Sequence, residues 1–312
     1  MTTTTISDAD HRDRLRAVDD PALETDIVTT GLVTDITVDD GTAAIELALG
    51  APHAPDEAAI AERAREVADE AGIDVELSAN VPLFDADVYG PNVPQMLGAD
   101  ADPDVTTVDS EDRIEPPTAH GLKLTSVGLM IDDDDPVVWR GPVAQNTLTD
   151  LFSDVSWGRL DYLVVDLPPG TGDVQLTVLQ HFAVTGTVVV TTPQSVAVDD
   201  THRGIEMFGE DQTNLLGVVE NMSGFVCPSC GDAHEIFGED GGRGLADVVD
   251  VPYLGSLPLD PAIRVGADDG EPIVRQNDAK TVEAFQNLTA TVANKVGVLR
   301  RHHRQTTTDD CR

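Results

Sequence analysis

Four apolar runs bounded by glycine and proline constrain the fold of this chain more than any other feature. They read LKLTSVGLM, YLVVDLP, TVVVTTP and LLGVVEN and occupy residues 122–130, 162–168, 187–193 and 215–221. Helical segments are expected near 142–152, 173–184, 197–209 and 280–302. Apolar strands that alternate with helices are typical of a parallel sheet covered on both faces. From residue 83 onward, the sequence therefore predicts an α/β fold with a doubly wound, mostly parallel sheet.

A different pattern comes before this sheet. Two β-branched runs, DIVTTGLVTDITV and TAAIELAL, are separated by the turn DDG, and a helix from Pro55 to Gly72 and a strand IDVELSA follow. We predict a small α+β domain at 11–80 and a larger domain at 83–300, which 312 residues can accommodate. Residues 1–10 and the tail 301–312 are expected to be disordered.

The chain is strongly acidic, with 57 Asp and Glu against 19 Lys and Arg and a net charge of −38. The acidic residues occur in every segment, so we interpret them as a halophilic solvation adaptation to a high-salt cytoplasm. Binding of cations or basic partners is the alternative. Nucleic acid is not expected as a partner, because phosphate binding needs a basic face and only the short stretch RRHHR is basic.

No apolar run approaches the roughly 20 residues that a membrane span requires, and the first thirty residues contain no signal-peptide pattern. We therefore expect a cytoplasmic protein that does not contact a membrane. Three cysteines, two of them in CPSC, do not make a disulfide framework.

The string DYLVVDLPPGTGD, residues 161–173, carries the strongest functional signal. An apolar strand ends in Asp166, and the loop Gly170, Thr171 and Gly172 then opens a helix at Asp173. In α/β folds, ligands bind at the carboxyl ends of strands. A carboxylate there can orient Mg²⁺ through water, and a glycine loop can respond to a γ-phosphate. The alternative interpretation is an ordinary strand-to-helix turn.

Two further carboxylates, Asp85 and Asp87, stand in LFDADVYG. Side chains at i and i+2 can face the same phosphate site only if the strand has ended, which the following Tyr-Gly-Pro indicates. A loop of solvated acidic residues is the alternative in so acidic a chain.

Cys227 and Cys230 form CPSCG, in which one turn carries two thiolates. A tetrahedral zinc ion or a cubane cluster needs four ligands, and Cys311 in the expected tail is a poor third ligand. Two chains related by a twofold axis would supply four thiolates. An iron–sulfur cluster, a zinc ion and an unligated turn all remain open. His234 is interpreted as a surface histidine.

Six motifs occur in an order that identifies a resemblance. DADVYGPNVPQML, DYLVVDLPPGTGD, VVTTPQSVAVDD, ENMSGFVCPSCG, IFG and LGSLPLDPAIRVGADDGEPIV resemble those of the Mrp-type iron–sulfur cluster carrier ATPases, of the MinD-like P-loop class. The likeness covers nearly all of 83–300. The preceding unit resembles the small iron–sulfur assembly-type domain often fused in front of such proteins. That domain usually has glycine where this chain has Glu24.

The resemblance implies a nucleotide site for ATP and Mg²⁺. Asp85 and Asp87 match the acidic pair on the switch I side, which would activate the attacking water and assist Mg²⁺. Asp166 matches the Walker B position and 170–172 match switch II. Asn221 matches an asparagine that would contact adenine through its amide donor and acceptor.

The resemblance also implies a cargo. Cys227 and Cys230 would share a [4Fe–4S] cluster across a homodimer, and the cluster would pass to apo iron–sulfur proteins. The nucleotide cycle would move the dimer between holding and releasing states.

One expected segment is missing from the sequence. This class binds phosphate through a loop of the form GKGGxGK[ST], which follows the small domain, but here SANVP runs directly into LFDADVYG. None of the three lysines stands in a glycine-rich, Ser/Thr-followed setting. A βαβ unit takes about 30 residues, so the second domain is expected to hold an incomplete sheet.

The missing segment has three possible explanations. The chain is a degenerate paralogue, its gene is incorrectly assembled, or its sheet is rearranged and keeps a binding role without catalysis. We predict impaired ATP hydrolysis by this polypeptide alone. A non-enzymatic zinc or cluster scaffold and a regulatory partner of an intact paralogue are the alternative functions.

Overall fold

The computed structural model describes residues 8–21, 23–30, 32–39, 42–47, 55–69, 81–99, 104–108, 111–130, 141–158, 160–210, 213–227, 229–230, 232–276 and 279–309. The chain forms two compact units. Unit 1 comprises 1–79 and 289–312, and unit 2 comprises 80–288. The last helix therefore contributes to both units, whereas the sequence placed everything up to residue 300 in the second domain.

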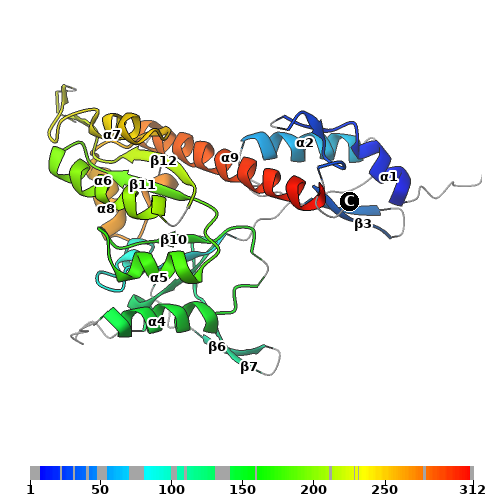
Figure 1. The fold of residues 1–312 in the computed structure, drawn as a ribbon, viewed down its shortest axis with the longest axis horizontal. Coiled ribbons are helices and arrows are strands. Elements are labelled where there is room, and N and C mark those ends of the chain that lie inside the picture. The colour runs from blue at the N-terminus through cyan, green and yellow to red at the C-terminus, as the bar shows by residue number, and fades with distance from the viewer. Residues whose placement is uncertain are drawn as a thin grey trace, which may run out of the picture. The chain divides into compact units, whose positions relative to one another are not determined.

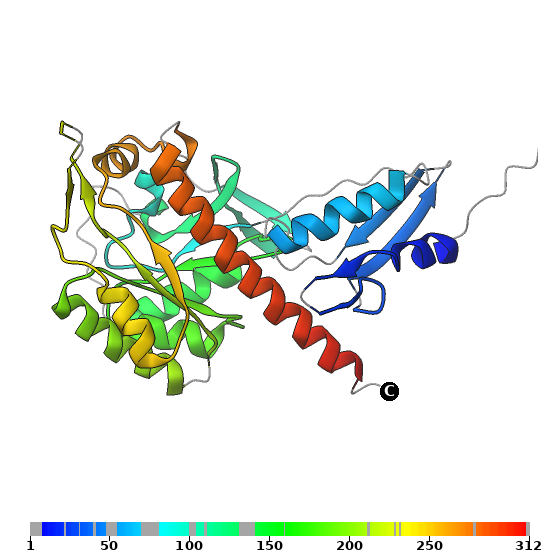
Figure 2. The same ribbon diagram turned by 90° about the horizontal axis from the view of Figure 1, so that it is seen from above.

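Unit 1 contains a β-hairpin and two helices. Its elements are α1 (Asp8–Leu15), β1 (Asp19–Asp20), β2 (Thr25–Asp26), β3 (Val33–Asp39), β4 (Thr42–Leu47) and α2 (Pro55–Asp69). Strands β3 and β4 pair antiparallel, as do β1 and β2, and Figure 2 shows the β3–β4 hairpin (blue) beside α2. The apolar core is built from side chains between residues 15 and 67, among them Leu15, Val18, Ile27, Leu32, Ile36 and Ile60.

Two expectations for the first eighty residues need comment. Helix α1 begins at Asp8, inside the range 1–10 that was expected to be disordered, because its last residue, Leu15, is buried in the core. The expected strand IDVELSA, at 73–79, lies outside the described residues.

Among its described residues, unit 2 contains two sheets with parallel strands, besides two two-stranded antiparallel pairs. The first has the strand order β10-β5-β9-β8, from β5 (Leu83–Asp85), β8 (Thr118–Ala119), β9 (Leu122–Ser126) and β10 (Val164–Asp166). Strands β10, β5 and β9 are parallel, and β8 is antiparallel to β9. Helices α4 (Gly141–Asp154) and α5 (Asp173–His181) share its core, where the Phe84 ring lies 6.0 Å from that of Phe182 and is edge-on to Trp157.

The second sheet has the order β11-β12-β15 and is entirely parallel. Its strands are β11 (Thr187–Thr191), β12 (Leu215–Glu220) and β15 (Tyr253–Ser256). Helices α6 (Ser195–Glu210) and α7 (Gly241–Val249) pack against it and share a buried core with Val189 and Val218. Figure 1 shows this sheet with α6 and α7 in the upper left of the view, and the first sheet with α4 and α5 below it.

The prediction of an α/β fold with mostly parallel strands is confirmed, but the parallel strands belong to two sheets. Several short elements were not expected: α3 (Val93–Met96), β6 (Asp104–Val108), β7 (Glu111–Glu115), β13 (Phe225–Val226), β14 (Ala233–His234), α8 (Pro261–Asp268) and the 3-10 turns at 127–129 and 273–275. Helix α9 (Ala279–Asp309) continues well beyond residue 301, where a disordered tail was expected, since no proline interrupts it.

Among the described residues, no helix combines the length and the apolar character needed to cross a membrane.

Candidate functional site

Asp85 lies at the carboxyl end of β5 and is completely buried. The Ser126 hydroxyl donates to Asp85 Oδ2 over 2.8 Å, and the backbone N–H of Asp87 donates to Oδ1 over 3.0 Å. Burial, together with the charges of Asp166 and Asp87, raises the pKa of Asp85 to about 6, although the two donors act to lower it. The protonation of Asp85 therefore depends on its burial and on three neighbours, Ser126, Asp87 and Asp166.

Asp87 and Asp166 complete a group of carboxylates at the same edge of the sheet. Asp87 Oδ1 accepts the backbone N–H groups of Tyr89 (3.1 Å) and Gly90 (3.0 Å), which closes the turn after β5. Asp166 lies opposite Asp85 in the parallel register and is exposed at the end of β10. Partial desolvation by the surrounding protein, together with the charge of Asp87, raises the pKa of Asp166. The structure therefore brings together the three acidic residues that the sequence singled out.

The loop after β10 is held by a residue that the sequence analysis missed. The buried Gln175 side chain accepts the N–H of Gly172 (3.0 Å) and donates to the carbonyls of Pro168 (2.7 Å) and Gly170 (3.0 Å). Gly170 has a φ of +92°, where a side chain would be strained. The available signal was Gln175 at the third helical position, where a side chain often reaches back to the preceding backbone.

Asn221 follows β12 in the second sheet. Its N–H donates to the Thr191 carbonyl (2.7 Å), and its Oδ1 accepts the N–H of Met222 (2.9 Å). The preceding Glu220 is buried, and its carboxylate accepts the N–H of Gly242 (2.7 Å) and the hydroxyl of Ser223 (2.6 Å). Glu220 therefore links the loop after β12 to the start of α7, a role that its place in an apolar strand could have suggested.

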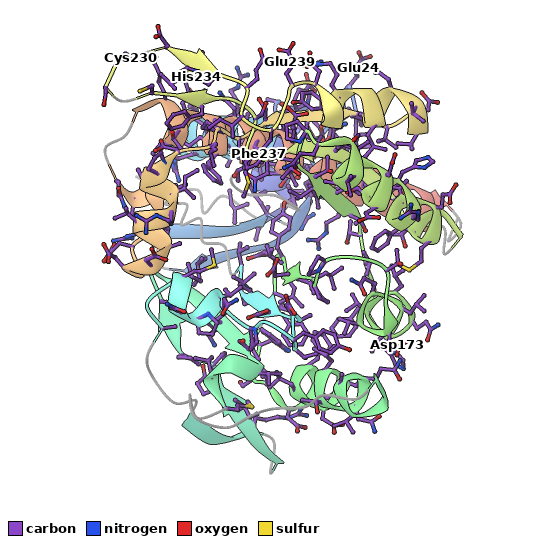
Figure 3. All side chains as sticks on the ribbon, turned by 90° about the vertical axis from the view of Figure 1, so that its left-hand side faces the viewer. Glu24, Asp173, Cys230, His234, Phe237 and Glu239 are labelled. Atoms are coloured by element: carbon purple, nitrogen blue, oxygen red, sulfur yellow. The ribbon has the colours of Figure 1, made fainter. Side chains whose placement is uncertain are left out.

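Cys227 and Cys230 lie between β13 and β14. Figure 3 shows Cys230 at the outer end of this hairpin. Both thiols are free, Cys230 is exposed, and the N–H of Cys227 donates to the Asp232 carbonyl (2.9 Å). Hydrogen bonds from the backbone N–H groups of Ser229 and Cys230, with a smaller one from the Cys230 side chain, lower the pKa of Cys227. The turn thus favours the thiolate, which is the form that binds metals.

His234 is exposed, and its ring centroid lies 6.4 Å from that of Phe225, across the hairpin. Within the described ranges, no cluster of three or more His, Cys, Asp or Glu side chains could hold a metal ion. The described part of one chain therefore offers two thiolate ligands, Cys227 and Cys230, and Cys311 lies outside the described residues.

The carboxylate edge, formed by Asp85, Asp87 and Asp166, and the cysteine hairpin, formed by β13 and β14 with Cys227 and Cys230 between them, are separate places in unit 2. In Figure 3, Asp173, at the start of α5, lies well away from Cys230 and His234. The described residues can thus offer carboxylates that orient a hydrated cation at one place and two thiolates that grip a metal at another.

Comparison with known proteins gives two family matches. Residues 71–293 match the family described as "ParA: NUBPL iron-transfer P-loop NTPase", and residues 9–78 match the family described as "Iron-sulfur cluster assembly protein". The two matches together cover most of the chain.

Curated relatives share the larger domain. An iron–sulfur cluster carrier protein of Synechocystis is 44% identical over 223 residues, which are 70% of this chain and 63% of that protein. The iron–sulfur cluster transfer protein NUBPL of the mouse is 40% identical over 220 residues, 70% of this chain and 68% of that protein. The chain spans about three fifths of the length of the first curated relatives it matches.

A solved structure supports the fold. The nucleotide-binding protein of Archaeoglobus fulgidus, determined in complex with ADP, is 31% identical, with a TM-score of 0.54 over 66% of this chain and 79% of that chain.

Proposed function

Because this chain belongs to the NUBPL iron-transfer P-loop NTPase family, we propose that it carries iron–sulfur clusters and transfers them to apo-proteins. The observation that supports this role is the hairpin with Cys227 and Cys230. Its thiols are free, the more accessible one is exposed, and hydrogen bonds stabilise the thiolate of the other. Such a pair can bind a cluster and still release it, because few protein groups enclose it.

The cluster would be a [4Fe–4S] cluster shared by two copies of the chain. One chain supplies two thiolates, and a cubane cluster needs four ligands. Val226 is 60% exposed and Ile236 is 54% exposed, and both flank the cysteines in sequence. Apolar side chains there would be buried if two hairpins met across a twofold axis, which favours a homodimer.

Anaerobic reconstitution tests this function. The full chain, purified in concentrated KCl, is incubated with iron and sulfide, and its visible absorbance and its iron and zinc contents are measured. We expect a brown protein with about four iron atoms per dimer, and loss of colour and iron in Cys227→Ala. Cys311→Ala is the matched control and should retain both. A colourless protein that retains zinc would contradict the proposal.

A zinc or cluster scaffold without enzymatic activity is the second candidate. The favouring observation is in the sequence, which contains no Gly-x-x-x-x-Gly-Lys-Ser/Thr string to hold phosphates. In this case metal would bind at the cysteine pair, and added ATP would not change the rate of cluster transfer to an apo-ferredoxin. The chain could also act as the regulatory partner of an intact paralogue.

ATP and Mg²⁺ are the ligands expected for this family. Asp85, Asp87 and Asp166 are the residues that would orient Mg²⁺. Residues 170–172 and Asn221 would contact the nucleotide. Carboxylates alone repel a triphosphate. We therefore propose that this polypeptide alone binds and hydrolyses ATP weakly. Titration with ATP and Mg²⁺ by calorimetry, in high salt, tests the proposal, and micromolar binding would contradict it. The acidic residues of this chain occur in every segment, which supports the proposal of a halophilic, cytoplasmic protein.

A further inference from the structure

The cysteine hairpin belongs to a longer segment that leaves the second sheet. The chain leaves the sheet after Glu220, the last residue of β12, and returns at the start of α7. Residues 221–224 form the outgoing stem of this segment, and residues 235–240 form the returning stem. In Figure 3, Glu239 lies on the return path from His234 to α7 (yellow). The position of the cysteines in unit 2 therefore depends on how the two stems are held at their base.

Backbone hydrogen bonds hold the outgoing stem. The N–H of Leu257 donates to the Glu220 carbonyl, and the N–H of Ser223 donates to the Leu257 carbonyl, each over 2.9 Å. The N–H of Leu259 then donates to the Gly224 carbonyl, also over 2.9 Å. The chain that follows β15 thus runs beside the outgoing stem, and the course of this stem is defined as far as β13.

The start of α7 is a fixed point at the end of the returning stem. Leu245 of this helix is buried in the core of the second sheet, and the Arg243 guanidinium lies 4.2 Å from the centre of the Tyr253 ring of β15. A side chain at Gly241 would collide with the backbone of Pro193, so the helix begins in direct contact with the loop after β11. The first turn of α7 is therefore held against the sheet on two sides.

The Glu220 side chain connects the two stems. Its Oε1 accepts the hydroxyl of Ser223 over 2.6 Å, and its Oε2 accepts the N–H of Gly242 over 2.7 Å. We call this pair of hydrogen bonds the Glu220 bridge. Glu220 is 1% exposed, and a Cβ added to Gly242 would lie 2.9 Å from Glu220 Cβ, so glycine permits the close approach that the bridge needs. Hydrogen bonds to a carboxylate are among the stronger ones in proteins.

The hairpin beyond the bridge has little support of its own. Its strands form two residue pairs, Phe225 with His234 and Val226 with Ala233. A two-stranded hairpin is marginally stable by itself. The direction in which this hairpin leaves unit 2 is therefore set at its base, where the Glu220 bridge joins the outgoing stem to α7.

We infer that Glu220 is a positioning residue for the cysteine hairpin. It acts through Ser223 and Gly242, and it fixes the hairpin on the second sheet. A consequence for the cargo rests on the function proposed above. Two chains can share a cluster only when their cysteine pairs meet in one geometry, and a hairpin of variable direction must lose conformational freedom to reach it. Loss of the bridge should therefore shorten the time for which a cluster is retained.

Hydrogen exchange of the metal-free full chain, in concentrated KCl, tests the positioning role. Glu220→Gln keeps the size of the side chain, but its amide accepts at one end and donates at the other, so one of the two donors loses its acceptor. We expect at least about tenfold faster exchange in 221–227 and 235–242, with exchange in 215–219 unchanged. Ser223→Ala removes one hydrogen bond of the bridge and should accelerate the same two segments.

Val218→Ala is the matched control, because it weakens the same strand without touching the bridge. Val218 is fully buried in the core of the second sheet. Its truncation should lower the temperature of unfolding and accelerate exchange across the sheet, with no selective effect on 221–227. If Glu220→Gln does not fold, Ser223→Ala tests the same bridge at a partly exposed position.

Two results would overturn the positioning role. One is equal exchange of 221–227 and 235–242 in the wild type and in the folded bridge variant. The other is an acceleration in that variant that is spread over the whole sheet, as in Val218→Ala, since this would show a general loss of stability.

Release of iron tests the consequence for the cluster. Each reconstituted protein is mixed with an excess of a ferrous-iron chelator under anaerobic conditions, and the absorbance of the iron complex is followed. Glu220→Gln should lose iron faster than the wild type, by up to about tenfold, whereas Val218→Ala should match the wild type. Equal rates for Glu220→Gln and the wild type would overturn this consequence. A wild type that binds no cluster would contradict the proposed function, and exchange in the metal-free protein would still decide the positioning role.

Discussion

The Ser126 hydroxyl donates to the buried Asp85 carboxylate across two neighbouring parallel strands, over 2.8 Å. The backbone N–H of Asp87 is the second donor, and Asp166 lies opposite Asp85 on the other side. Two donors partly stabilise a charge that burial and two other carboxylates destabilise. The carboxylate edge is thus a place where protonation, and not geometry alone, determines what can bind.

Asp85 should make stability depend on pH. Its folded pKa of about 6 lies above the ordinary value of 3.8, so the folded chain binds more protons than the unfolded chain between these values. The free energy of unfolding must then fall as pH rises from about 4 to about 6, by up to about 3 kcal/mol. Asp85→Asn stays uncharged and should escape this loss.

Chemical denaturation of both proteins at a series of pH values measures the effect. The advantage of Asp85→Asn over the wild type should grow through that interval and stay constant above it. The exposed Asp247→Asn is the control and should show no such trend. A difference between Asp85→Asn and the wild type that does not vary with pH would show that the pKa of Asp85 is not raised.

Gln175→Ala should open the loop that follows β10. The substitution leaves the Gly172 N–H and two carbonyls without their partner and should lower the free energy of unfolding by about 1–3 kcal/mol. Hydrogen exchange at 170–172 should become faster. Gln180→Ala, on an exposed position of the same helix, is the control. Unchanged exchange in Gln175→Ala would mean that the side chain does not hold the loop.

Glu24→Gly should stabilise unit 1. Glu24 has a φ of +49°, in the left-handed region, which explains why the related domain usually has glycine there. Removing the side chain relieves that strain and should raise the free energy of unfolding by about 0.5–1 kcal/mol, after the greater entropy of unfolded glycine. Asp19→Gly, in strand β1, should instead destabilise the unit. Thermal unfolding of both variants distinguishes these results.

Cys227 should react with iodoacetamide at a lower pH than an ordinary thiol. Hydrogen bonds from the N–H groups of Ser229 and Cys230 lower the pKa of Cys227, so its rate should reach half of its maximum at a lower pH than the rate of an unperturbed thiol does. Mass spectrometry of the metal-free protein gives the rate at each pH, with N-acetylcysteine as the reference. Cys230→Ser should retain most of the shift, because the backbone donors remain. Coincident profiles for Cys227 and the reference would contradict the prediction.

The site could be predicted where its signal is local. Asp166 and Gly170 were found because a strand end and a glycine loop are adjacent in the chain, and Cys227 and Cys230 because they share one turn. Gln175, Ser126 and Glu220 were missed because their partners are defined only once loops and strands are folded together. A hydrogen bond between residues 126 and 85 has no counterpart in either local sequence.

The sequence by itself determined the α/β class, the main alternating strands and helices of the larger domain, the family and the cysteine pair, because periodicity, turn residues and motifs are properties of short segments. The given sequence also contains no Gly-x-x-x-x-Gly-Lys-Ser/Thr string. Only the tertiary structure decided that, among the described residues, the parallel strands form two sheets. Strand pairing is a choice between segments distant in sequence, and it depends on which backbone groups the fold brings within hydrogen-bonding distance.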